Sequence, residues 1–241
     1  MHRMRDPHAE SRRTGDVEGQ GHLIKEVSMT YEIQKAWGVL LRLFHWIYAI
    51  TIIILLITGY YIYNPLLGPH EGGAPFTMAS TRYIHFVAGY AFIGGIVVRI
   101  YLFFFGNKQE RFLDSAPVTP RNIKNLFGTI IYYLYLTDRH EERLGHNALF
   151  MLFYIITLFL ALVQALTGIY MLFPENLTLQ SIGIGLFGTQ QQARLIHHLI
   201  LWYFIIFTMT HIYITIWNDI EKPEGLISSI FNGDKFKPKK A

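Results

Sequence analysis

Four long apolar runs divide the chain, and polar segments separate them. The runs cover residues 39–63, 83–105, 147–173 and 195–218. Each is long enough to cross the hydrocarbon core of a bilayer as a helix, which takes about 20 residues. The strands of a membrane barrel would be about 10 residues long and would alternate apolar with polar positions. The pattern therefore predicts an all-α membrane protein, a four-transmembrane-helix bundle.

The polar segments predict the limits of the domain. Residues 1–30 are polar and lack an apolar core, which predicts a flexible N-terminal extension and no secretory signal. Residues 31–235 then form the four-helix domain, and residues 236–241 a basic tail. Residues 120–136 place apolar side chains on one side of a helix at its start. This favours either a short helix lying on the membrane surface or a loop that packs on the bundle.

The number of lysine and arginine residues alternates between high and low from one polar segment to the next. The segment up to Arg42 has seven, the next connection one, the connection from Arg99 to Arg143 seven, the third one, and the C-terminal tail five. Basic residues concentrate on the cytoplasmic side of membrane proteins. Both termini and the middle connection are therefore expected in the cytoplasm. The net charge of +4 does not indicate nucleic acid as a partner, because the basic residues lie beside the apolar runs.

Composition narrows the chemistry. The chain is 51% hydrophobic and 16% charged, whereas about a quarter of the residues of a soluble domain are charged. Cysteine is absent, which excludes disulfides, thiolate zinc sites, iron–sulfur ligation and covalent c-type haem in this chain. Histidine is plentiful, with 11 residues. No catalytic nucleophile or phosphate-binding glycine loop is evident.

Five histidines fall inside the apolar runs, where an ionisable side chain is costly and usually functional. They are His45, His85, His197, His198 and His211. One such histidine is explained by a hydrogen bond to a neighbouring carbonyl, but several at matched depths are not. His85 and His197 each begin a run on the outer side, whereas His45 and His211 lie toward the cytoplasmic side.

The spacing of the histidines within the fourth run favours two metal sites at different depths. His197 and His211 are 14 positions apart, which places them on nearly the same helix face and about 21 Å apart along the axis. His198 points elsewhere, so His197 is the favoured ligand. Matching by depth pairs His45 with His211 and His85 with His197. Two imidazoles on opposite sides suit a b-type haem, whereas zinc needs three or four clustered ligands. We therefore predict two haem b groups and electron transfer across the bilayer.

A weak two-plus-two repeat runs through the chain. The first run ends ITGYYIYNP and the third LTGIYMLFP, and the second begins TRYIHF and the fourth ARLIHH. In this register Arg99 is the counterpart of His211, and Tyr154 that of His45. Arg99 is compatible with three roles: a partner of a haem propionate, a residue near a quinone, or a basic anchor whose long side chain reaches the membrane surface.

At these residues the sequence resembles the cytochrome b subunit of membrane-bound nickel–iron hydrogenases, within a wider group that includes formate dehydrogenase gamma subunits. The resemblance covers about residues 31–235, and residues 1–30 depart from it. The segments that carry it are RLFHW at 42–46, ITGYYI at 57–62, RYIHFVAGY at 82–90, RLIHHLILWY at 194–203, HIYITIWND at 211–219 and EGLISSIFNG at 224–233.

The resemblance implies a function and a location. The chain would be a multi-pass protein of the bacterial inner membrane, bound to the small and large subunits of a hydrogenase on the periplasmic side. His45, His85, His197 and His211 would be the axial ligands of two haems. Electrons would cross to the cytoplasmic side and reduce menaquinone or ubiquinone, as part of a hydrogen:quinone oxidoreductase.

Two alternatives stay open. The partner can instead be a formate dehydrogenase or a thiosulfate-type reductase. In a different class, the chain is a haemless membrane anchor or transporter, in which the histidines transfer protons or pack between helices. The sequence does not identify the quinone, its binding site or the oligomeric state.

Overall fold

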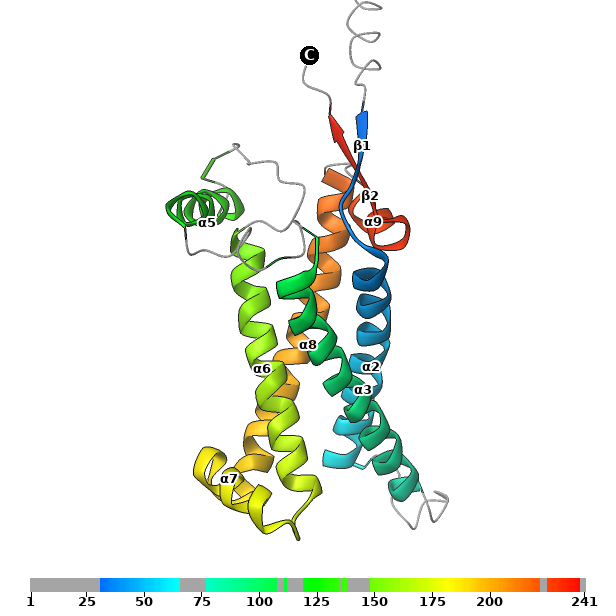
Figure 1. The fold of residues 1–241 in the computed structure, drawn as a ribbon, viewed down its shortest axis with the longest axis vertical. Coiled ribbons are helices and arrows are strands. Elements are labelled where there is room, and N and C mark those ends of the chain that lie inside the picture. Colours follow the sequence, from blue (N-terminus) through cyan, green and yellow to red (C-terminus); the bar gives the residue numbers. More distant parts are fainter. Residues whose placement is uncertain are drawn as a thin grey trace, which may run out of the picture. The chain divides into compact units, whose positions relative to one another are not determined.

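Four long helices dominate the protein. The computed structural model describes residues 31–65, 77–107, 111, 119–134, 136–137, 148–221 and 225–238. The long helices are α2 (Val39–Tyr63), α3 (Thr77–Phe105), α6 (Ala148–Leu172) and α8 (Gln190–Glu221) (Figure 1). All four are long and apolar enough to cross a membrane, so the predicted all-α membrane fold is confirmed. The helices α3 and α8 begin several residues before the predicted runs, because their first turns are polar.

The outer surface of these helices is apolar. Only 11–28% of the apolar window of each long helix is buried inside the protein. Large side chains such as Ile57, Phe104 and Ile206 are exposed over 66%, 70% and 65% of their surface. A soluble protein does not expose apolar surface to this extent, whereas lipid accepts it. The chain is therefore a membrane protein.

The long helices form a ring. Helix α2 packs against α3 and α8, and α6 packs against the same two helices. As a result α2 lies diagonally opposite α6, and α3 opposite α8. The core lies halfway along the length of the helices. It consists of Phe92 and Ile96 from α3, Ala161 from α6, and Ile200 and Phe204 from α8.

Proline ends two of the four long helices in the same way. Pro65 follows α2 after one intervening residue, and Pro174 follows α6 after one intervening residue. The residue before a proline avoids the helical conformation, and proline cannot continue the hydrogen-bond ladder. The corresponding ends of the two repeat halves therefore stop for the same steric reason.

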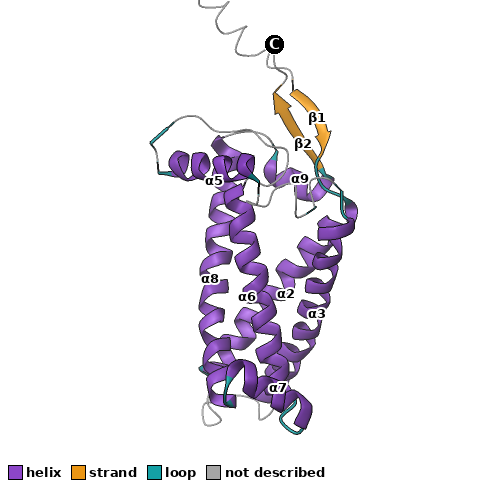
Figure 2. Ribbon diagram, turned by 60° about the vertical axis from the view of Figure 1, so that its left-hand side comes forward, coloured by secondary structure: helices purple, strands orange, loops and turns teal. Residues whose placement is uncertain are grey.

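Helix α5 (Pro120–Tyr133) confirms the helical interpretation of the middle connection. The Thr119 hydroxyl accepts a hydrogen bond from the Asn122 N–H at 3.2 Å, and Pro120 occupies the first turn, where its missing N–H costs nothing. The helix lies across the end of α6 (Figure 2). Its position on a membrane surface stays a prediction.

Helix α7 (Leu177–Phe187) lies in the connection between α6 and α8. The Asn176 side chain caps it by accepting from the Leu179 N–H at 3.0 Å. The Gln180 amide then ties it to the end of α6 by donating to the Tyr170 carbonyl at 3.1 Å. A side chain at Gly183 would overlap the Tyr170 ring, so α7 packs closely on α6. Helix α7 marks the end of the bundle opposite α5 (Figure 1).

The C-terminal segment folds back onto the start of α2 through helix α9 (Leu226–Asn232). Asp219 caps α9 by accepting from the Leu226 N–H at 2.5 Å. The Trp37 indole donates to the fully buried Ser229 hydroxyl at 3.1 Å. Gly233 ends α9 with a φ of +93°, and a Cβ there would lie 2.8 Å from the Trp37 carbonyl. We call residues 225–233 with their contacts on α2 the tail clamp.

Two short strands were not predicted. Strands β1 (Tyr31–Lys35) and β2 (Asp234–Pro238) pair in a two-stranded sheet. They belong largely to a compact unit of their own, Met1–Gln34 with Phe236–Ala241. The predicted flexibility of residues 1–30 lies outside the described residues.

Candidate functional site

His85 of α3 and His197 of α8 face each other near α7, and we call them the α7-side pair. Their ring centroids are 6.4 Å apart, and the ring planes make an angle of 64°. The Thr58 hydroxyl lies 2.8 Å from Nδ1 of His85, and the Thr167 hydroxyl lies 2.9 Å from Nδ1 of His197. The two halves of the repeat therefore build the two sides of this pair with the same residues.

The threonines determine which nitrogen of each ring is free. Thr58 donates its only hydroxyl hydrogen to the Ile54 carbonyl at 2.7 Å, so it can only accept from His85. Thr167 donates in the same way to the Val163 carbonyl at 2.9 Å. Nδ1 of both histidines must then carry the hydrogen, and Nε2 keeps its lone pair. This is the tautomer that a metal-binding imidazole needs.

His45 of α2 and His211 of α8 form a second pair nearer α5, the α5-side pair. Their ring centroids are 6.3 Å apart, with an angle of 48° between the planes. Phe207 stacks on His211 one turn away, at 5.8 Å between centroids. Nδ1 of His45 is buried and has no hydrogen-bond partner in the described part of the chain. His211 is exposed, whereas the other three paired histidines are half-buried.

An apolar layer separates the two pairs. Phe92 lies seven positions after His85, and Phe204 seven positions after His197, so both lie halfway to the other layer. Their rings meet edge to face at 6.1 Å between centroids and are nearly fully buried. The layers are about 21 Å apart along α8 by the helix rise. We call this central layer, built around Phe92 and Phe204, the septum.

Sequence comparison identifies the family of the chain. A family model described as prokaryotic cytochrome b561 matches residues 36–233. The chain belongs to the prokaryotic cytochrome b561 family. It is 34% identical over 206 residues to the probable Ni/Fe-hydrogenase B-type cytochrome subunit of Azotobacter vinelandii, covering 80% of this chain and 84% of the relative.

Other relatives carry similar descriptions. The probable Ni/Fe-hydrogenase B-type cytochrome subunit of Cupriavidus necator is 32% identical over 234 residues, which is 91% of this chain and 92% of the relative. The probable Ni/Fe-hydrogenase 1 B-type cytochrome subunit of Escherichia coli K12 is 28% identical over 204 residues, covering 80% and 86%. The predicted resemblance to cytochrome b subunits of nickel–iron hydrogenases is thereby confirmed.

Membership of a b-type cytochrome family implies haem b, and both histidine pairs fit it. A metal–imidazole bond is about 2 Å long, so two imidazoles on opposite sides of one metal hold their ring centroids roughly 6 Å apart. The observed separations are 6.3 and 6.4 Å. No group of three or more histidine or acidic side chains that could hold a metal ion occurs among the described residues. Each layer therefore offers two ligands, the number a porphyrin-bound iron requires. The haem number and the ligand roles stay predictions.

Glycines leave room for the rings of the α7-side pair. A Cβ at Gly59 would lie 3.3 Å from Cε1 of His85, closer than most such contacts, and one at Gly168 would lie 3.5 Å from Cε1 of His197. Each glycine directly follows the threonine that holds the same histidine. Both threonines therefore support an imidazole, and Gly59 in addition leaves room for one.

His198 does not join the pairs. Its ring stacks on Tyr63 at 3.9 Å between centroids, and its Nε2 accepts from the Trp202 indole N–H at 3.1 Å. Because Tyr63 belongs to α2, the stacked ring of His198 makes a contact between two helices. Its neighbour His197 is the one that faces His85.

Arg99 and Tyr154, the counterparts of His211 and His45 in the repeat, also contact each other. Arg99 of α3 donates a hydrogen bond from Nε to the Tyr154 hydroxyl of α6. Its guanidinium carbon lies 4.4 Å from the centre of the Phe103 ring. Arg99 is only 2% exposed, so it is not a side chain that reaches for the membrane surface. A pseudo-two-fold axis along the bundle thus relates the α5-side pair, His45 with His211, to the pair Tyr154 with Arg99.

Sequence reasoning did not single out Thr58, Thr167 or the septum. The threonines were visible as the repeated Thr–Gly of ITGYY and LTGIY, at equivalent positions of the two halves. A small polar residue repeated at the same depth as a buried histidine is the signal that would have found them. Phe92 and Phe204 occupy matched positions too, but an aromatic residue in an apolar run carries no distinguishing signal.

Proposed function

We propose that this chain is the di-haem membrane subunit of a nickel–iron hydrogenase, which anchors the enzyme and transfers its electrons across the membrane to quinone. The observation that carries the proposal is the presence of two histidine pairs, each spaced for one iron, at two depths of a lipid-exposed bundle. The descriptions of the relatives as hydrogenase B-type cytochrome subunits support the choice of partner.

Each group of residues has a defined task in this proposal. When bound, haem b would supply a one-electron redox couple in each layer. His85 and His197 would hold one group, and His45 and His211 the other. Thr58 and Thr167 keep the first two imidazoles in the ligating tautomer. The septum excludes water between the layers, which prevents protons from crossing with the electrons.

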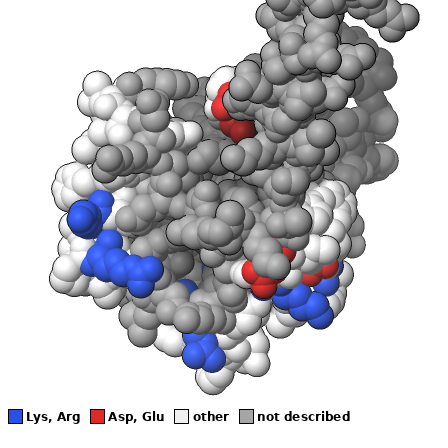
Figure 3. All heavy atoms as spheres, turned by 90° about the horizontal axis from the view of Figure 1, so that it is seen from above, with Lys and Arg blue, Asp and Glu red and all other residues white. Residues whose placement is uncertain are grey.

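Charge supports an orientation. Arg121 and Lys124 belong to α5, and Arg42 lies near the start of α2. Figure 3 shows basic side chains at several places on the described surface of this end, and acidic ones at fewer. Arg82 and Arg194 lie at the α7 end. By the positive-inside rule, we infer that the α5 end and both termini are cytoplasmic in the bacterial inner membrane. The α7-side pair then lies nearer the periplasm, where the small and large hydrogenase subunits bind.

Haem stoichiometry tests the proposal. The purified subunit should contain two haem b per chain by the pyridine haemochrome assay. His85→Ala or His197→Ala should each leave one, and the matched control His198→Ala should leave two. A subunit without haem would favour the anchor or transporter, and a subunit that keeps both haems in each variant would contradict the assigned ligands.

The electron donor needs a separate test. In membranes that contain the partner enzyme, hydrogen should reduce the haems, and added menaquinone or ubiquinone analogues should reoxidise them. The rate with each analogue identifies the preferred quinone. Reduction by formate and not by hydrogen would assign the chain to the formate dehydrogenase group instead.

A further inference from the structure

Arg99 is a permanent positive charge buried inside the membrane-spanning part of the bundle. Its Nε donates to the Tyr154 hydroxyl, but its Nη1 is buried and has no hydrogen-bond acceptor in the part of the chain that the structure describes. The four long helices contain only two acidic residues, Asp219 and Glu221, both near the C-terminal end of α8, and Asp219 caps α9. A buried cation is stable only when it is paired. The anion that Arg99 requires is therefore not supplied by these helices.

Tyr48 of α2 supplies a second unused donor close to Arg99. Its hydroxyl is buried and has no hydrogen-bond partner among the described residues. Its ring packs on the backbone of α3 at Gly95, one turn before Arg99, where a Cβ would overlap the ring. The hydroxyl also interacts electrostatically with that of Tyr154 on α6. Polar groups from three helices thus converge inside the ring of helices, and we call Tyr48, Arg99 and Tyr154 the inner polar cluster.

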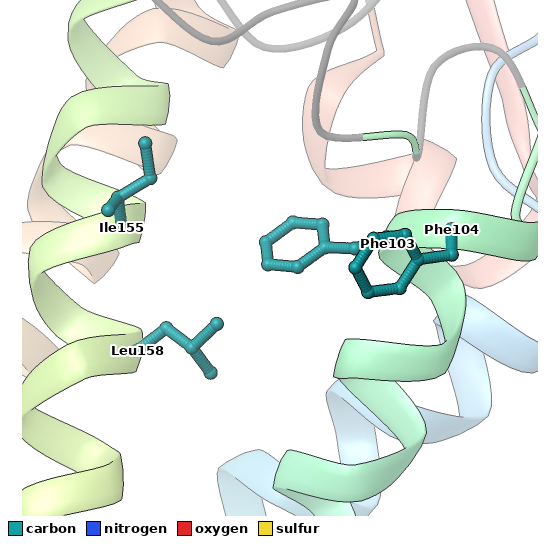
Figure 4. A pocket seen from close by; sticks show the side chains of 4 residues that line it. All are labelled: Phe103, Phe104, Ile155 and Leu158. Atoms are coloured by element: carbon teal, nitrogen blue, oxygen red, sulfur yellow. The ribbon is translucent and has the colours of Figure 1, made fainter.

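An aromatic side chain covers the guanidinium on the side of the gap between α3 and α6. The Arg99 guanidinium carbon lies 4.4 Å from the centre of the Phe103 ring. Figure 4 shows this ring reaching from α3 toward α6, where it forms one wall of an apolar crevice with Phe104, Ile155 and Leu158. No polar atom lines that crevice, and Arg99 is not part of its wall. The acceptor for Arg99 therefore belongs on the inner side of Phe103, toward the centre of the bundle.

The inner polar cluster lies in the layer of the α5-side pair. Arg99 and Tyr154 are the counterparts of that pair in the repeat, and so have the same depth. Tyr48 follows His45 by three positions, which places both on the same face of α2. The Tyr48 ring stacks on Phe92 of the septum at 4.9 Å between centroids. The septum therefore bounds the cluster on one side, and a group held by the α5-side pair would have the cluster as its polar neighbour.

We propose that the inner polar cluster binds a propionate carboxylate of the haem that the α5-side pair would hold. This inference rests on the proposed function. Haem b carries propionate side chains, which are anionic. Arg99 Nη1 and the Tyr48 hydroxyl provide one donor for each oxygen of a carboxylate, and charge-assisted hydrogen bonds of this kind are strong where water is excluded. A carboxylate is favoured over a neutral carbonyl, because only an opposite charge compensates a buried guanidinium.

Redox titration of the purified subunit tests the arginine. Arg99→Gln leaves the carboxylate uncompensated, which favours the more positive ferric state, so the midpoint potential of one haem should fall while that of the other stays. The same haem should be lost about tenfold faster in detergent. Arg99→Lys keeps the charge and should restore most of the potential. In a His85→Ala background, which by the proposed function retains only the haem of the α5-side pair, Arg99→Gln should lower the potential of the remaining haem.

A charge also acts at a distance, so direct contact needs its own readout. The propionate bending band in the resonance Raman spectrum responds to hydrogen bonds on the carboxylate, and it should shift in Arg99→Gln and in Tyr48→Phe. Tyr203→Phe is the matched control, because the Tyr203 hydroxyl is already bonded to Thr157 at 2.6 Å, and the band should stay as in the wild type. Tyr48→Phe keeps the ring and its packing, so it tests the contact even if the arginine variant does not fold. A fall in potential with an unshifted band would overturn the proposal.

The two proposals fail in different ways. If the wild-type subunit contains no haem, the proposed function is wrong. If it contains two haems, and their potentials and propionate bands are unchanged in Arg99→Gln and Tyr48→Phe, the function stands and only the assigned acceptor is wrong. Slower reoxidation of the haems by quinone in those same variants would then assign the arginine to the quinone.

Discussion

Thr58 and Thr167 show how a single hydroxyl determines the tautomer of a histidine. Each donates its hydrogen to a carbonyl of its own helix and accepts from the imidazole of another helix. The ring then has one orientation and one tautomer before any metal binds. Groups that orient a ligand in this way typically change metal affinity by about 10–100-fold.

Removal of either hydroxyl should therefore weaken one haem. Thr58→Val and Thr167→Val keep the shape and delete the acceptor, so we expect faster loss of one haem in detergent and an altered midpoint potential of that haem. Thr157→Val is the control, because Thr157 also bonds a carbonyl and a side chain, Tyr203, but no histidine. Haem retention and a redox titration measure the difference. Equal losses in all three variants would contradict the assigned role.

The two glycines beside the α7-side pair should differ in tolerance. A Cβ at Gly59 meets Leu201 at 3.2 Å and His85 at 3.3 Å, whereas a Cβ at Gly168 meets His197 at an ordinary 3.5 Å. Gly59→Ala should displace His85 and lower haem content. Gly168→Ala should keep both haems and gain about 0.5–1 kcal/mol of helix stability. Pyridine haemochrome analysis and thermal unfolding compare the two, and equal haem content would show that the Gly59 contact is not limiting.

At the scale of elements, the tail clamp holds the start of α2 in place. Arg42 donates to the Phe231 carbonyl, and Trp46, next to His45, packs on the Phe231 ring at 4.7 Å between centroids. The backbone N–H groups of Ala36 and Trp37 both donate to the Gly233 carbonyl, at 2.8 and 3.2 Å. The segment EGLISSIFNG, one of those that resemble the hydrogenase subunits, thus contacts the turn that carries a predicted ligand.

Two neighbouring serines test the tail clamp. Ser229 is fully buried and accepts from Trp37, whereas Ser228 is exposed and donates only to the Gly225 carbonyl of its own turn. Ser229→Ala leaves the indole N–H unpaired, which costs about 1–3 kcal/mol, so the thermal midpoint should fall. Ser228→Ala should leave it unchanged. Tryptophan fluorescence during heating measures both, and identical midpoints would show that the clamp adds little stability.

At the scale of the whole molecule, the bundle is symmetric at one end and asymmetric at the other. The α7-side pair joins α3 to α8 and is supported equally by α2 and α6. The α5-side layer holds histidines between α2 and α8, but arginine and tyrosine between α3 and α6. The two histidines of that layer are spaced for one iron, whereas the other half holds a buried cation hydrogen-bonded to a tyrosine.

Orientation in the membrane can be measured directly, because the chain has no cysteine that would react with a label. Glu175→Cys, in the connection before α7, should react with an impermeant maleimide added to periplasm-accessible cells. Lys124→Cys, on α5, should react only after the inner membrane is permeabilised. The reversed pattern would show that the positive charges do not determine the topology.

Much of the candidate site could be predicted from the sequence because it depends on position along a helix. Apolar length marked α2, α3, α6 and α8, and the 14-residue interval favoured His197 over His198. Helix α7 was missed because its apolar run is too short to span and too uniform to show a face. Strands β1 and β2 were missed because their pairing joins opposite ends of the chain.

The sequence by itself determined the number of spans, the depth of each histidine and the two-plus-two repeat. These are one-dimensional properties, since a helix converts residue number into height at a constant rise. Only the tertiary structure decided which helices are neighbours. That arrangement brings Thr58 to His85, Arg99 to Tyr154 and His198 to Tyr63. Each face of a helix carries different residues, and only the packing of the helices determines which face contacts another segment of the chain.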